Sequence, residues 1–247
     1  AMRTAVDGYW INDGVQLSAQ HAHAAWTAYA DVGVWQGQAF PSSPQAQPSW
    51  TAHVGAQREG WRGDAFVADV DAPQRGAMAF SATGTHSHNA PTCDQLSSGV
   101  LCFGGRSLLW GLSGAWTPQG WPVTVQGAYV VRQDRGTLSS VNGVADHRGD
   151  YEGGWAQVLW DVHPQWQAGV RSEHLRLKAS VQGAGAQLLA QEAGLLGSTA
   201  IERHSLMVGW RVTPQLSLHA EAGQEKQGAQ RVSYGLLRAV MRFQTGL

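Results

Sequence analysis

The sequence predicts an all-β protein, a transmembrane antiparallel up-and-down β-barrel of which about eleven strands are visible. Three observations predict this fold. Apolar and polar residues alternate with a period of two, short and long connections alternate along the chain, and tryptophans recur beside the short connections. Only 14% of the 247 residues are charged, while 31 are glycine and 12 are tryptophan, a composition typical of strands and turns with aromatic belts.

Charge and hydropathy exclude several classes of protein. No run of about 18 apolar residues occurs, which excludes a transmembrane helix. The 17 basic and 18 acidic side chains give a formal net charge of −1 without a basic block, so we expect no nucleic-acid partner. Phosphate-loop, dinucleotide-binding and CxxC signatures are absent from the sequence.

The alternation defines strands from the N-terminus onward within a single predicted domain, residues 1–247. In the first half, the apolar sets that start at Trp26 and at Trp50 place every second residue on one face. In the second half, the sets that start at Ala156, Leu206 and Leu216 do the same. The predicted strands are 14–20, 25–36, 49–57, 62–70, 105–116, 121–133, 152–162, 165–176, 202–212, 215–224 and 231–243.

The connections between these strands alternate in length, which favours an outer-membrane barrel over a soluble sandwich. Proline followed by glutamine recurs at Pro118, Pro164 and Pro214, where proline suits a tight turn. Short periplasmic turns are predicted near 21–24, 58–61, 117–120, 163–164 and 213–214. Long extracellular loops are predicted at about 37–48, 71–104, 134–151 and 177–201.

Tryptophans beside the short turns are expected to form a membrane girdle, because their amphipathic rings favour the membrane–water interface. The predicted girdle residues are Trp26, Trp116, Trp121, Trp166 and Trp210. The opposite rim is assigned to Trp35, Trp50 and Trp155.

Eleven is an odd number of strands, whereas bacterial single-chain barrels have even numbers. We therefore expect an incomplete barrel that lacks N-terminal strands. The alternative is a strand overlooked in 1–12 or in 71–104.

Two parts of the chain also resemble a known family. They are Asp13–Ser18 continuing through Trp26–Trp35, and the hairpin from Gly153 to Arg171. They resemble a Gram-negative outer-membrane barrel family of porin-like proteins, often described as zinc-regulated and TonB-dependent-like. The resemblance covers about residues 8 to 243 and matches the C-terminal part of the family's barrel.

This resemblance implies a location in the outer membrane of a Gram-negative bacterium. It implies outer-membrane lipid and lipopolysaccharide, the barrel assembly machinery, and small solutes or ions as partners. Members carry further strands ahead of Asp13, which agrees with the odd strand count. No plug domain is visible in the sequence, which argues against TonB-coupled transport.

Charged residues at the polar positions of the strands are expected to line the pore. The predicted set is Arg132, Arg171, Arg203, Arg211, Arg238, Arg242, Asp31, Asp69, Asp161, Glu173, Glu221 and His219. Arginines outnumber carboxylates in this set, which predicts a weak preference for anions. The alternative is a ladder of neutralised pairs that selects nothing.

Two sites are predicted in the long loop around residue 90. His86 and His88 are a candidate zinc site if the loop curls, and a solvated loop is the alternative; no other cofactor is expected. Cys93 and Cys102 lie close together in a stretch rich in Gly, Ser and Pro, which favours a disulfide over two free thiols.

A catalytic triad is not expected. His204 and Ser205 are adjacent on a strand and face opposite sides, although His219 and Asp161 could supply the remaining groups. No G-x-S-x-G motif occurs, so we expect the protein not to be an enzyme. The stretch 184–196 contains helix-forming residues and is expected to form a short helix in a loop.

The sequence thus predicts an outer-membrane porin-like channel for passive or facilitated passage of small solutes or ions, with a metal-related cargo as one option. The alternative is a non-conducting barrel that acts as a surface binding or scaffold protein through its long loops. A soluble β-sandwich is the third option.

Overall fold

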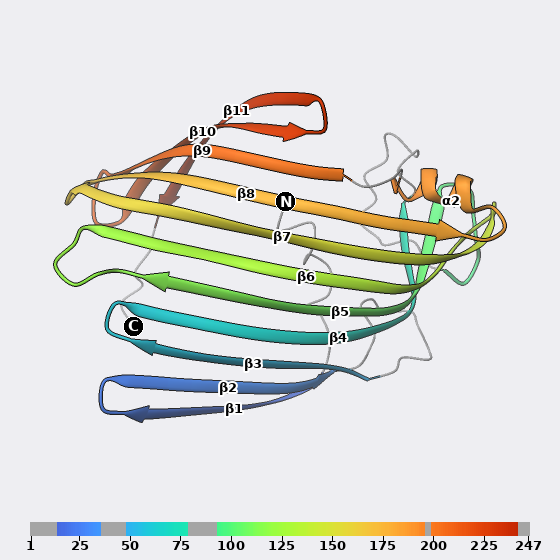
Figure 1. The fold of residues 1–247 in the computed structure, drawn as a ribbon, viewed down its shortest axis with the longest axis horizontal. Coiled ribbons are helices and arrows are strands. Elements are labelled where there is room, and N and C mark those ends of the chain that lie inside the picture. The colour runs from blue at the N-terminus through green and yellow to red at the C-terminus, as the bar shows by residue number, and fades with distance from the viewer. Residues whose placement is uncertain (1–13, 36–47, 79–92, 196–198, 242–247) are drawn as a thin grey trace.

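The computed structural model describes residues 14–35, 48–78, 93–195 and 199–241. It contains one antiparallel sheet in which every strand pairs with its neighbours in sequence, in the order β1 to β11 (Figure 1). The strands are β1 (Gly14–His23), β2 (Trp26–Trp35), β3 (Ser49–Arg58), β4 (Trp61–Met78), β5 (Val100–Trp116), β6 (Val123–Ser140), β7 (Gly143–His163), β8 (Trp166–Gln182), β9 (Thr199–Arg211), β10 (Leu216–Gln227) and β11 (Gln230–Met241). The predicted all-β up-and-down fold is confirmed.

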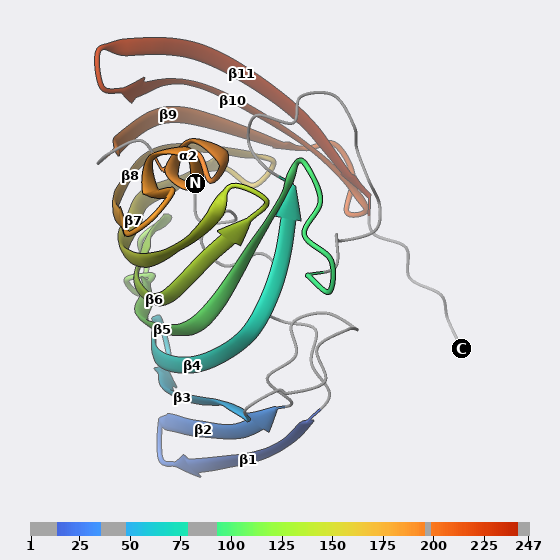
Figure 2. The ribbon, with the colours of Figure 1, turned by 90° about the vertical axis from the view of Figure 1, so that its right-hand side faces the viewer.

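The sheet curves strongly, with β1 and β11 at its two edges (Figure 2). Within the described residues no pairing joins these two edges. Since neighbouring strands are antiparallel, β1 and β11 run in the same direction, and a seam between them would be parallel. The predicted completion by N-terminal strands concerns residues outside this description and stays a prediction.

The two faces of the sheet differ in polarity, because successive side chains of a strand point to opposite faces. One face, termed the outer face, carries exposed apolar side chains in every strand. These include Leu17, Val32, Val54, Leu112, Val125, Val158, Val170, Leu206, Val208 and Leu237. Such a belt is typical of the lipid-facing surface of a membrane barrel. The inner face carries most of the polar side chains of the strands.

The structure places four of the predicted girdle tryptophans on the outer face at the short-turn end of the sheet, and Trp121 in the turn between β5 and β6. Trp166 stacks on Trp210 with ring centroids 5.4 Å apart. Trp61 and Trp160 lie at the same end and were not predicted.

The assignment of Trp35 and Trp155 to the opposite rim was wrong. Both lie on the inner face, because each stands at a polar position of its strand. Trp35 Nε1 donates to Thr51 Oγ1 at 2.9 Å, and the Arg171 guanidinium lies over the Trp155 ring at 4.5 Å. Trp50 does lie on the outer face, paired with Val34 and Asp69.

The prediction of a long loop at 134–151 was also wrong. β6 and β7 continue through this range and meet at a turn of two residues, Val141 and Asn142. β4, β5 and β8 likewise extend into the predicted loops 71–104 and 177–201. Beyond the apolar belt both faces of these strands can be polar, so the alternation that marks a strand in the sequence disappears. The loop 37–48 lies almost entirely outside the described residues.

The extended strands carry a small apolar core on their inner face. The predicted loop helix is confirmed as α2 (Ala186–Glu192), whose fully buried Leu189 packs against Leu101, Leu138 and Ala145. The predicted disulfide joins Cys93, ahead of β5, to Cys102, near the start of that strand's pairing with β4. Within the described residues, no helix is long and apolar enough to cross a membrane.

Candidate functional site

The register of the strands shows which predicted pore-lining residues share a face. One row across five strands runs through Asp161, Gln167, Gly209, His219 and Arg238. The same register places ten of the twelve predicted residues on the inner face. They are Asp31, Arg132, Asp161, Arg171, Glu173, Arg203, Arg211, His219, Glu221 and Arg238.

Two predicted residues are not placed on that face. Asp69 lies on the outer face beside Trp50, where Arg106 Nε donates to its carboxylate at 2.6 Å, so its assignment to the pore was wrong. The alternation is interrupted there because β4 continues past the apolar belt. Arg242 lies outside the described residues.

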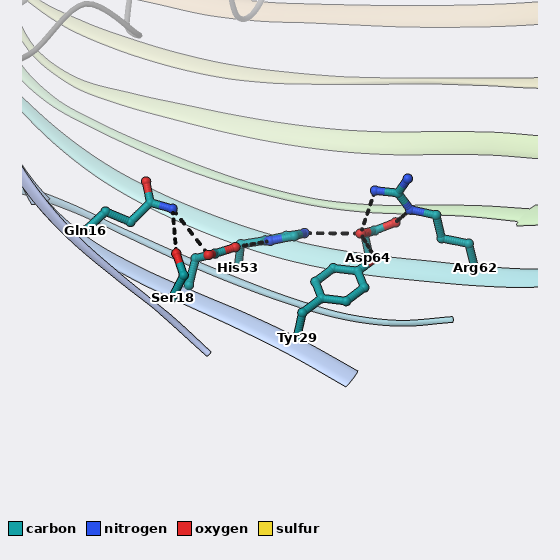
Figure 3. Close-up of polar contacts among 7 residues, drawn as sticks. Gln16, Ser18, Tyr29, His53, Arg62 and Asp64 are labelled. Carbon is teal, nitrogen blue, oxygen red and sulfur yellow. Dashed lines mark hydrogen bonds and ion pairs between the residues drawn. The ribbon is translucent and has the colours of Figure 1, made fainter. Parts of the chain in front are cut away.

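One polar cluster lies on the inner face of β1 to β4 and is termed the His53 network (Figure 3). His53 Nδ1 lies 2.9 Å from Asp31 Oδ2, and His53 Nε2 lies 3.2 Å from Asp64 Oδ1. Tyr29 donates its hydroxyl to Asp64 Oδ1 at 2.6 Å, and Arg62 Nε donates to Asp64 Oδ2 at 3.1 Å. Five side chains from three strands therefore form one connected network.

At the β1 end, two further side chains extend the network. Gln16 Nε2 lies 3.3 Å from Asp31 Oδ1 and 3.3 Å from Ser18 Oγ (Figure 3). Both side chains are exposed at the edge strand of the sheet. The network thus runs from a partly buried carboxylate, Asp64, to an open edge.

Local sequence explains how Tyr29 reaches Asp64. Gly55 stands on β3 directly opposite Tyr29, and a Cβ at Gly55 would lie only 2.3 Å from the Tyr29 ring. The tyrosine ring therefore lies flat over the glycine, and only glycine leaves room for it. Any larger side chain at position 55 would displace the hydroxyl from Asp64.

The hydrogen bonds favour one charge state of the His53 ring. An ionised carboxylate only accepts hydrogen bonds, and an imidazole donates from both nitrogens only when it carries a proton on each. Since both ring nitrogens face carboxylate oxygens, the arrangement stabilises the protonated, cationic form of His53 between Asp31 and Asp64. With Arg62, two cations then balance two carboxylates.

A second cluster, termed the Arg–Glu ladder, lies on the inner face of β8 to β10. Arg171 Nε lies 2.6 Å from Glu173 Oε1, and Arg203 Nη1 lies 3.8 Å from Glu173 Oε2. Arg203 Nη2 donates to Glu225 at 2.5 Å. Glu173 is only 10% exposed, so its charge depends on both arginines for stabilisation.

Between the two clusters the inner face is less polar. Phe66, Ala68, Val70 and Leu109 of β4 and β5 form an apolar patch. Next to it, Arg132 Nη2 lies 2.6 Å from Asp134 Oδ2. This patch separates the His53 network from the Arg–Glu ladder.

At the short-turn end of β7 to β10, a hollow of about 540 Å³ opens between the hairpins. Asp161, Arg211 and His219 line it. Gln167 Nε2 donates to Asp161 Oδ1 at 2.8 Å, and His219 Nε2 lies 3.1 Å from Ser217 Oγ. Three predicted pore-lining residues are therefore brought to one place.

The charges of the described inner face are close to balanced. Its six arginines are Arg62, Arg132, Arg171, Arg203, Arg211 and Arg238. Its seven carboxylates are Asp31, Asp64, Asp134, Asp161, Glu173, Glu221 and Glu225. The predicted excess of arginine is thus not found, because Asp64, Asp134 and Glu225 join the set. The basis for an anion preference disappears with it.

The remaining sequence-based candidates are those for a zinc site and for a catalytic triad. His86 and His88 lie outside the described residues. Within the part of the chain that is described, no three His, Cys, Asp or Glu side chains are grouped as a metal site. His204 lies on the outer face and Ser205 on the inner face.

Sequence reasoning assigned no role to His53, Arg62, Asp64, Asp134 or Glu225. The signal that could have found three of them is the alternation itself. His53, Arg62 and Asp64 all stand at polar positions of predicted strands. Asp134 and Glu225 each lie one residue beyond the end of a predicted strand.

Comparisons place this architecture among known folds. No family model and no curated protein sequence matches the chain. Among solved structures, it is similar to OmpT, an outer-membrane protein of Vibrio cholerae, with a TM-score of 0.55, 12% identity and 91% of this chain covered. A loop L8 deletion mutant of the same protein gives a TM-score of 0.55 with 13% identity and 91% coverage. The chain spans 64% and 62% of the length of those two structures.

At such low identity the likeness shows the fold, which is that of outer-membrane β-barrel proteins, and it supports the predicted outer-membrane location. The comparisons do not single out the porin-like, zinc-regulated family.

The expectation that the protein is not an enzyme is corrected. The structures that it resembles share a fold found in enzymes and in non-enzymes. In a barrel, catalytic groups come from separate strands, so a missing local motif excludes nothing. The fold leaves enzymatic activity open.

Proposed function

We propose that this chain forms the wall of an outer-membrane channel of the porin-like kind, for passive or facilitated passage of small solutes or ions. The observation that carries the proposal is the contrast between the faces. The outer face is an apolar belt with tryptophans at one end, whereas the inner face holds six arginines and seven carboxylates. Charged side chains in a membrane barrel face water or one another.

Near-balanced charge implies weak selectivity. Arg62, Arg132, Arg171 and Arg203 each have a carboxylate within ion-pair distance. Among the described residues, Arg211 and Arg238 have none, and both lie toward the short-turn end. We therefore expect only a slight preference between anions and cations, set at that end.

One observation favours the alternative of a non-conducting barrel that binds partners at the surface. α2 packs on the inner face of the extended strands, and Leu189 is fully buried beneath it. This packing fills space at the long-loop end of the wall. If the lumen were closed there, the protein would not conduct, and the loops at that end would bind the partners.

Single-channel recording distinguishes the two functions. The protein is inserted into planar bilayers, and conductance and reversal potential are measured with and without zinc. Steady ohmic steps with a reversal potential near zero are expected. Block by zinc that is lost in a His86→Ala/His88→Ala variant would support the predicted zinc site.

A loop variant tests the role of α2. Replacing residues 184–195 by a Gly/Ser segment of equal length is expected to increase the conductance, because the helix narrows the long-loop end. A correctly inserted protein that stays silent, with and without the helix, would contradict the channel and favour the scaffold.

A further inference from the structure

Three arginines form a row on the outer face, beyond the end of the apolar belt. Arg106 of β5 pairs in register with Arg135 of β6, and Arg135 pairs with Arg148 of β7. All three side chains are exposed, Arg106 by 68%. We call Arg106, Arg135 and Arg148 the arginine row.

The row begins at the edge of the belt. On β5 the outer-face residues leading toward it are Leu112, Trp110 and Leu108, and Arg106 follows next. The row lies at the end of the strands opposite the short turns and the tryptophans. In outer-membrane barrels the end with short turns faces the periplasm, so the row faces the outer leaflet and the cell surface.

Like charges placed directly opposite each other on neighbouring strands destabilise a sheet. Carboxylates of the same face reduce this repulsion in part, and one of them, Asp71 of β4, stands directly opposite Arg106. Arg106 is paired with Asp69, and Arg135 Nη2 lies 2.8 Å from Asp150 Oδ1. Within the described residues Arg148 has no ion-pair partner, although Asp150 stands two residues further along on the same face of β7.

Arg135, the middle member of the row, is held in place by the backbone. Arg135 Nη1 donates to the carbonyl oxygens of Asp134 at 2.8 Å and Gly149 at 3.0 Å. A guanidinium has five N–H donors, so these contacts and one ion pair leave donors free. Lys178 of β8 stands opposite Asp150 and adds a further exposed cation.

We propose that the arginine row, with Lys178, binds the phosphates of a phosphorylated glycolipid of the outer leaflet, such as lipopolysaccharide. Guanidinium groups suit this ligand because they bind phosphate oxygens in bidentate fashion. A basic group at the edge of an apolar belt places its donors where lipid headgroups lie. The proposal rests on the outer-membrane location and not on conduction, so a silent barrel would leave it standing.

The test measures binding of purified, fluorescently labelled lipid A to the full chain folded in detergent. Bis-phosphorylated lipid A is expected to bind at least about tenfold more tightly than dephosphorylated lipid A. The variant Arg135→Gln/Arg148→Gln is expected to lose that preference, and the binding is expected to persist in EDTA.

A matched control removes the same charge elsewhere on the outer face. Lys226 and Arg231 are also opposite one another, on β10 and β11, and Lys226 lies 3.7 Å from Glu202. The variant Lys226→Gln/Arg231→Gln is expected to retain the affinity. An equal loss in both variants, or no preference for the phosphorylated lipid, would overturn the site. Binding that requires Mg²⁺ and survives the Arg135/Arg148 substitutions would assign recognition to the carboxylates instead.

Discussion

The His53 network and the Arg–Glu ladder both stabilise carboxylates on the inner face, but they do so with different cations. Both hold carboxylates on the inner face, and both surround one that is mostly buried, Asp64 and Glu173. In the ladder, both cations are arginines, whose charge is permanent. In the network, one cation is a histidine, whose charge depends on its proton.

This difference predicts how each region fails. Loss of Arg203 from the ladder leaves Glu225 without an arginine and Glu173 with Arg171 alone, within the part of the chain that is described. The network shares its charge among His53, Arg62 and the Tyr29 hydroxyl, so that Asp64 keeps two partners when one is removed. The ladder should therefore be the more sensitive region to single substitutions, and the network the more sensitive to pH.

The largest effect is expected from Arg203→Ala. Among the described residues, Arg203 is the one arginine that contacts both Glu173 and Glu225. Because a buried carboxylate would lose a partner, we expect a loss of about 2–3 kcal/mol in the free energy of unfolding. Urea unfolding in lipid vesicles, followed by tryptophan fluorescence, measures it. Arg238→Ala is the control, since that exposed side chain has no ion pair among the described residues, and it should change stability by less than about 0.5 kcal/mol.

A smaller effect is expected from His53→Ala. Two hydrogen bonds to carboxylates are lost, but Arg62 and Tyr29 still bind Asp64. We expect a loss of about 1–2 kcal/mol in the same unfolding assay. His219→Ala provides the comparison, because the His219 ring contacts only the Ser217 hydroxyl among described side chains. A cost for His53→Ala above that of Arg203→Ala would contradict the ranking of the two regions.

The two regions also show what the sequence could and could not predict. Strand alternation alone predicted the inner face for Arg171, Arg203 and Glu173, because parity within a strand needs no knowledge of its neighbours. The pairing across strands depends on register, which turn lengths set. Glu225 and Asp134 were missed because the predicted strands ended one residue before them. Their omission produced the excess of arginine on which the expectation of an anion preference rested.

The Tyr29–Asp64 contact could not be predicted for another reason. It requires the tyrosine ring to lie over Gly55 of the neighbouring strand. The sequence around a glycine in a strand does not indicate which side chain of the next strand packs over it. The arginine row is similar, since its three members lie on three strands and only the register brings them together.

The smallest effect sharpens the comparison through pH. When the pH rises far enough for His53 to lose its proton, the His53 network should lose one positive charge, while the Arg–Glu ladder keeps its charges. The described inner face, with six arginines and seven carboxylates, then becomes more negative, and the reversal potential in planar bilayers should shift toward cation selectivity. In His53→Gln this shift should shrink, because glutamine keeps a hydrogen-bond donor but does not titrate. His219 and His163 line the hollow at the short-turn end, so His219→Gln is the matched control. If the shift disappears in His219→Gln and persists in His53→Gln, the pH-sensitive charge belongs to the hollow. The His53 network would then stabilise β2 to β4 without affecting ion selectivity.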